Sequence, residues 1–101
     1  MDERGGDVAT LLADRLRLVA ALSGLGAEAL KLQQREGALR IERMRLEESG
    51  AAAGTDLEEE TAALEAARRD LDERVAAAER DIGTIDRLLA ESGGGGGRNR
   101  R

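Results

Sequence analysis

Leucine recurs at every seventh position through the first half of the chain. The repeat runs six times without a miss, at Leu11, Leu18, Leu25, Leu32, Leu39 and Leu46. A strict seven-residue repeat keeps one apolar stripe of an α-helix facing a partner helix, as in the seam of a left-handed coiled coil. Because the chain also has no proline, the repeat predicts one long helix over residues 7–49.

The second half repeats the same pattern with a less regular set of residues. One seam row is Leu57, Leu64, Leu71, Ala78 and Ile85, and the other is Thr61, Arg68, Val75, Ile82 and Leu89. The C-terminal part is therefore apolar in both rows, whereas the N-terminal part has polar residues in one of them. This pattern predicts a second long helix over residues 55–92.

A short bend over residues 50–54 separates the two predicted helices. Gly50 is placed to adopt the left-handed conformation that ends many helices. Thr55 and Glu58 have the spacing of a capping box, which predicts the start of the second helix. A connection of this length favours antiparallel neighbours, so we expect an all-α, antiparallel long-helix hairpin within a single helical domain over residues 1–92.

Further apolar residues lie about 100 to 140° around the first helix from its seam. These residues are Leu12, Leu16, Val19, Leu30, Ile41 and Met44. A single partner helix cannot cover both stripes, so a third helix, another protein or a second copy is needed. One alternative is a break in the first helix at Ser23, Gly24 and Gly26, with residues 7–22 folded back to make a three-helix bundle. The preferred prediction is a continuous, bent helix. Residues 93–101 are expected to form a flexible, glycine-rich basic tail.

Composition restricts the chemistry available to this chain. It has no His, Cys or aromatic residue, so the usual general base, thiolate and commonest metal ligands are missing. We expect no enzymatic activity, cofactor or metal. The net charge is −5, with the acidic excess in the second helix, and this argues against nucleic-acid binding. No apolar run is long enough for a membrane span, so a cytoplasmic protein without membrane contact is expected.

One local sequence resembles a known family. The run Arg40-Ile41-Glu42-Arg43-Met44-Arg45 closes a charged helix, and a short bend and a second heptad helix follow it. Over residues 16–89 this arrangement is similar to tubulin-binding cofactor A, a family of small cytoplasmic helical chaperones. The resemblance implies nucleotide-independent holding of β-tubulin folding intermediates after their release from the chaperonin, and association with the cytoskeleton.

The resemblance directs attention to the charged faces beside the bend. The residues expected to contact β-tubulin are Arg40, Arg43, Arg45, Glu58 and Glu59. The alternative is a structural coiled-coil subunit that homodimerises or joins a larger complex through an open apolar stripe of Leu16, Val19, Leu30 and Met44. We expect a monomer under the first interpretation, and a homodimer remains open under the second.

Overall fold

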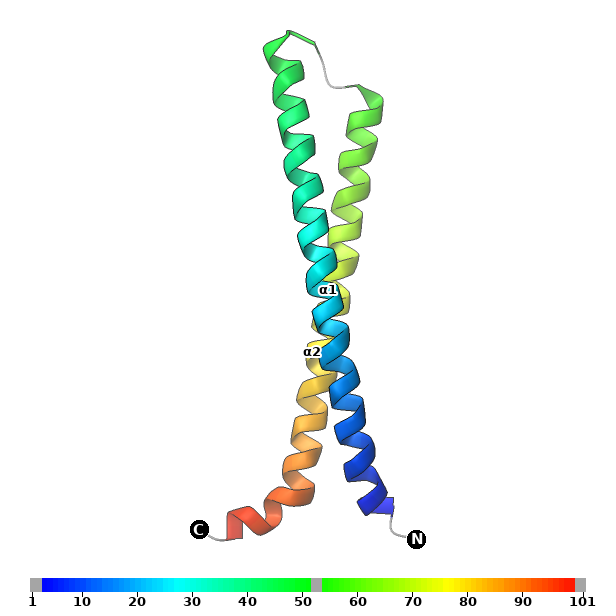
Figure 1. Ribbon diagram of the computed structural model, residues 1–101, viewed down its shortest axis with the longest axis vertical. Helices are drawn as coiled ribbons and strands as arrows, with labels where there is room; N and C mark the ends of the chain where they lie inside the picture. The colour runs from blue at the N-terminus through cyan, green and yellow to red at the C-terminus, as the bar shows by residue number, and fades with distance from the viewer. Residues whose placement is uncertain (1–2, 52–53, 100–101) are drawn as a thin grey trace. The chain divides into compact units, whose positions relative to one another are not determined.

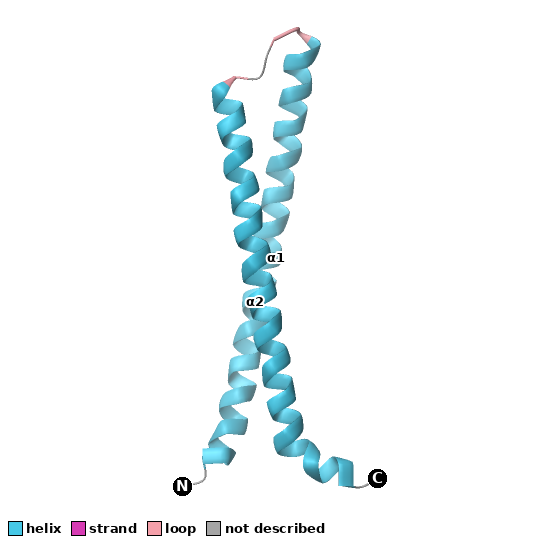
Figure 2. Cartoon of the chain, turned by 180° about the vertical axis from the view of Figure 1, so that it is seen from behind, coloured by secondary structure: helices cyan, strands magenta, loops and turns pink. Residues whose placement is uncertain are grey.

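The chain folds into two long α-helices that form an antiparallel hairpin (Figure 1). The computed structural model describes the backbone of residues 3–51 and 54–99 and the side chains of residues 8–51 and 54–92. Helix α1 spans Glu3–Glu48 and helix α2 spans Thr55–Asn99. Helix is the only regular secondary structure in the described ranges (Figure 2). The predicted all-α hairpin is confirmed.

Helix α1 is continuous through the small residues that were able to interrupt it. Ser23, Gly24 and Gly26 all lie inside the helix, although each glycine makes a helix about 1 kcal/mol less favourable than alanine does. Six consecutive seam leucines outweigh this cost because they bury one side of the helix along its length. Residues 7–22 do not fold back, and the three-helix alternative is therefore wrong.

The end of α1 is a Schellman motif centred on Gly50. This glycine has a φ of 80°, in the left-handed region that residues with a Cβ adopt at a cost. The Gly50 N–H donates to the Glu47 carbonyl over 3.1 Å, and the Ala51 N–H donates to the Leu46 carbonyl over 2.8 Å. These bonds satisfy two carbonyls that have no partner within the helix, and they stop α1 as predicted.

The predicted capping box at the start of α2 does not form. The Glu58 N–H donates to the Gly54 carbonyl over 3.1 Å, so Thr55 is already the first helical residue. A capping box needs Thr55 just outside the helix with its side chain on that same N–H. The backbone bond occupies the donor instead, and Thr55 is inside the helix rather than capping it.

Both helices extend beyond the predicted ranges at the chain ends. Helix α1 begins at Glu3 instead of Asp7, and α2 includes residues 93–99, which were assigned to the tail. Glycine can adopt the helical backbone conformation even though it favours it weakly. The last two residues of the predicted tail lie outside the described part of the chain.

The contacts divide the chain into two compact units. Unit 1 combines Met1–Gly24 with Val75–Arg101, and unit 2 is Leu25–Arg74, which includes the bend. In unit 2 the seam residues Leu39, Leu57 and Leu71 are buried, and Leu71 is only 2% exposed. In unit 1 the seam residues Ala78 and Ile85 are buried. The heptad rows identified in the sequence therefore supply the core of each unit.

Two polar layers interrupt the apolar seam of unit 2. Arg43 donates from Nη2 to Thr61 Oγ1 over 3.2 Å, and the Thr61 hydroxyl donates to the Leu57 carbonyl over 2.9 Å. One helical repeat further from the bend, Arg68 Nη1 lies 3.7 Å from Glu36 Oε1. These pairs explain why one seam row is polar near the bend. Polar residues in a seam fix the register because any shift leaves them without partners.

Candidate interaction surface

The outer side of α1 in unit 1 exposes a group of large apolar side chains. Leu12 is 53% exposed, Leu16 is 71% exposed and Val19 is 42% exposed. They follow one another at intervals of four and three residues, which places them on one face of a helix. Folding of unit 1 therefore leaves an apolar face of α1 in contact with solvent.

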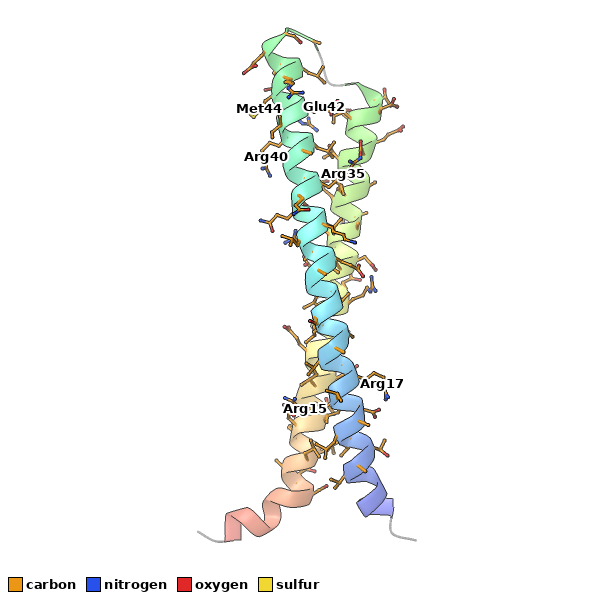
Figure 3. All side chains as sticks on the ribbon, viewed as in Figure 1. Arg15, Arg17, Arg35, Arg40, Glu42 and Met44 are labelled. Carbon is orange, nitrogen blue, oxygen red and sulfur yellow. The ribbon has the colours of Figure 1, made fainter. Side chains whose placement is uncertain are left out.

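Unit 2 exposes a second group on α1. Leu30 is 55% exposed, Ile41 is 56% exposed and Met44 is 52% exposed. Met44 and Arg40 project from the same side of the helix (Figure 3). Together the two groups contain all four residues of the predicted open stripe, and all four are exposed. Large apolar patches on a protein surface commonly mark binding sites.

A groove near the bend lies between the helices of unit 2. It has a volume of about 470 Å³ and is lined by Glu36, Leu39, Arg40, Arg43, Thr61, Leu64 and Glu65. Leu39 and Leu64 are seam residues, whereas Arg40 and Glu65 belong to its exposed rim. The groove joins apolar side chains to charges of both signs, a composition suited to protein contacts.

The five charged residues expected to contact a partner occupy different environments. Arg40 lines this groove, and Arg43 is half-buried with its guanidinium bonded to Thr61. Arg45 is exposed in the last turn of α1, where a positive charge stabilises the helix dipole. Glu58 and Glu59 are exposed near the start of α2. The structure therefore brings only Arg40 and Arg43 together, and Arg43 already has a role in the seam.

Helix α2 has an acidic row along one flank. Its members are Glu58, Glu65, Asp72, Glu79 and Asp86, which are spaced seven apart and are all exposed. The acidic excess of this half was predicted from the sequence, whereas its arrangement in a row was not. Its repulsion discourages any negatively charged surface from approaching this flank of α2.

An ion pair joins the two helices within unit 1. Arg15 Nε lies 2.6 Å from Asp86 Oδ1, and both side chains are partly exposed. The hydrogen bond from Arg15 lowers the pKa of Asp86, and the positive charge acts in the same direction. The pair therefore links α1 and α2 of unit 1 electrostatically.

Two features are absent from the described residues, a group of metal ligands and a membrane-spanning stretch. No three acidic side chains among them lie close enough together to hold a metal ion. Neither helix, over its described residues, has an apolar stretch that could cross a lipid bilayer.

Sequence reasoning missed the polar partners inside the seam. Glu36 and Arg43 lie in one row on α1, and Thr61 and Arg68 lie in the facing row on α2. The signal was present as polar residues at seam positions on both sides of the bend. Pairing them in antiparallel order would have identified both layers and the register.

These features define an all-α helical hairpin with an exposed apolar face on its first helix. No protein family, characterised protein or solved structure matches the chain.

Proposed function

We propose that the chain is a non-enzymatic assembly subunit that binds an α-helix of another polypeptide through the outer face of α1. The observation that carries this proposal is the exposure of six large apolar side chains on one helix, between 42% and 71%. Each apolar side chain left in water forgoes stabilisation worth roughly 25 cal/mol per Å². A surface of this kind is stabilised when a partner covers it.

The spacing of these residues supports a helical partner. Leu12, Leu16 and Val19 recur at intervals of four and three residues, the pattern by which one helix anchors against another. The hairpin supports this face because another side of α1 packs in the seam. Assembly would therefore need little reorganisation of the subunit.

The proposal is tested by placing a charge on the outer face. Leu16→Glu in α1 is compared with Leu88→Glu in α2, since Leu88 is also exposed, at 42%. Both variants should keep the helical circular dichroism of the parent. Crosslinking in cells followed by mass spectrometry should show that Leu16→Glu loses crosslinks from α1, whether to other proteins or to other copies, and that Leu88→Glu keeps them. An unchanged crosslink pattern in Leu16→Glu would refute the assembly function.

A second candidate is a cofactor that holds β-tubulin folding intermediates in the cytoplasm, as the resemblance of the Arg40–Arg45 run implies. The favourable observation is the exposure of Arg40, Arg45, Glu58 and Glu59 in unit 2. Under this proposal the charged end of unit 2 contacts the client, and the apolar face of α1 covers client surface that would otherwise aggregate. No nucleotide is needed because holding requires binding alone.

Size-exclusion chromatography with light scattering tests the second candidate. β-Tubulin diluted from denaturant is added to the protein, and a one-to-one complex is the expected result. Arg40→Glu should weaken the complex, whereas Arg17→Glu, in unit 1, should not; the Arg17 side chain is 72% exposed. Aggregation of β-tubulin at the same rate with and without the protein would exclude this candidate.

A further inference from the structure

One row of residues on α1 alternates between small and large side chains. The row, called here the outer row, consists of Ala9, Leu16, Ser23, Leu30, Gly37 and Met44, spaced seven apart. Its large members are among the exposed apolar residues of α1. The alternation is therefore a series of projections and gaps along the outer side of the helix.

Gly24, Gly26 and Gly37 of α1 have no packing role among the described residues. A Cβ placed on Gly26 or Gly37 would meet no atom within 4 Å. Glycine is a poor helix former, and nothing in the described structure requires it at these positions. Close packing of a partner on the outer side of α1 would explain these glycines, because a larger side chain would block the approach.

The outer row is complementary to itself when it is read in the opposite direction. In that order Leu16 faces Gly37 of a second copy, Leu30 faces Ser23, and Met44 faces Ala9. A shift by one heptad places large residues against large ones. A shift by two heptads restores the alternation but leaves two of the six positions without a partner.

The neighbouring row of α1 has nearly the same centre of symmetry, half a residue away. It consists of Leu12, Val19, Gly26, Gln33 and Arg40. In the same antiparallel register Gly26 faces its own copy, Val19 faces Gln33, and Leu12 faces the aliphatic part of Arg40. The two helices therefore come closest where neither has a side chain, next to Gly26.

In the hairpin, one row of α1 already pairs with a row of α2 in antiparallel order. In unit 2, Arg43 pairs with Thr61 and Glu36 pairs with Arg68. Seven residues backward on α1 correspond to seven residues forward on α2. The register proposed for the second copy follows the same antiparallel rule on another side of α1.

The contact is large enough for a specific dimer. From Ala9 to Met44 the helix rises by about 50 Å, and a helix face is about 10 Å wide. The footprint is roughly 500 Å² on each copy, or about 1,000 Å² for the pair, which reaches the area expected of a biological interface. The acidic row keeps two copies of α2 from making a comparable contact.

We infer that the partner of α1 is α1 of a second copy, packed antiparallel around a two-fold axis beside Gly26. Residues 9–23 of α1 then face residues 30–44 of α1 in the other copy, and the reverse contact follows by symmetry. This inference rests on the proposed assembly function and identifies its partner.

Crosslinking at two alanines tests the register directly. The chain has no cysteine, so each variant carries a single thiol. Ala27 and Ala20 are both exposed on α1 and lie one heptad apart. In the proposed dimer the two copies of Ala27 lie side by side, whereas those of Ala20 are separated by roughly 20 Å. A short bis-maleimide should crosslink Ala27→Cys and not Ala20→Cys. A parallel dimer would crosslink both equally and would overturn the inference.

Exchanging a projection and a gap tests the complementarity. Sedimentation equilibrium should give the parent chain twice the 10.7 kDa mass of one copy. Gly37→Leu is accommodated in the hairpin but collides with Leu16 of the second copy, so the dimer Kd should rise by roughly 30-fold or more. Gly83→Leu makes the same change on α2, also into open space, and should leave Kd within about threefold. Combining Leu16→Ala with Gly37→Leu should restore dimerisation.

The two proposals fail in different ways. If the chain sediments as one copy at all concentrations, the inference that a second copy is the partner is wrong. Loss of α1 crosslinks to other proteins in Leu16→Glu would then still support the assembly function. A dimer that Gly37→Leu leaves unchanged also overturns this register. If the chain sediments as one copy and Leu16→Glu also keeps its crosslinks in cells, both proposals are wrong.

Discussion

Replacing Leu71 with alanine tests whether the heptad seam holds the hairpin together. Leu71 has the most buried large side chain described, at 2% exposure. The substitution removes three carbon groups, worth about 0.8 kcal/mol each on burial, or about 2.4 kcal/mol. The cavity adds to this loss, although two helices can partly close around it. We expect a loss of about 3 kcal/mol in the free energy of unfolding.

Urea unfolding followed by circular dichroism measures this loss. With an m-value of about 1.5 kcal/mol per molar urea, the midpoint should fall by about 2 M. Leu88→Ala is the control, because Leu88 is on the same helix but 42% exposed, and it should cost less than about 1 kcal/mol. Leu64→Ala, at a half-buried seam position, should fall between the two. Equal losses for Leu71→Ala and Leu88→Ala would show that the seam is wrongly placed.

Two further predictions concern glycine and pH. Gly50→Ala should lower the free energy of unfolding by about 1–2 kcal/mol in urea melts, because Gly50 has a φ of 80°. Gly24→Ala, with open space around the new Cβ, should raise the free energy of unfolding by about 0.5–1 kcal/mol. Changes of the opposite sign would contradict the conformations assigned to these two glycines. Because its arginine partner lowers the pKa of Asp86, this carboxylate stabilises the fold fully above the ordinary pKa of Asp, about 3.9. That contribution is lost as the pH falls through the lowered pKa, so Asp86→Asn should flatten the acid side of a stability profile, and an unchanged slope would argue against the pair.

The hairpin was predictable because its two main signals are local and repeated. The leucine seam determines which side of each helix is buried, and Gly50 marks the end of α1 through a conformation that few other residues adopt. The start of α2 was less predictable, since Gly54 and Thr55 compete for the same backbone donor. Only the folded backbone shows that the Gly54 carbonyl accepts it.

The candidate surface was predictable in part for a similar reason. The exposure of Leu16, Val19, Leu30 and Met44 follows from their angle to the seam. The position of Arg43 did not follow from its charge, because an arginine at a seam position can reach either solvent or a polar partner. Thr61 on the facing helix directs it inward, and this depends on the register of the hairpin.

The position of the bend also has a consequence for the order of folding. The contact between Arg43 and Thr61 closes a segment of 18 residues, whereas the contact between Arg15 and Asp86 closes one of 71 residues. Closing the longer segment first costs about 1.2 kcal/mol more, since each doubling of length adds about 0.6 kcal/mol. Helix pairing is therefore expected to start next to Gly50 and to proceed away from the bend, so that Arg15 and Asp86 pair late.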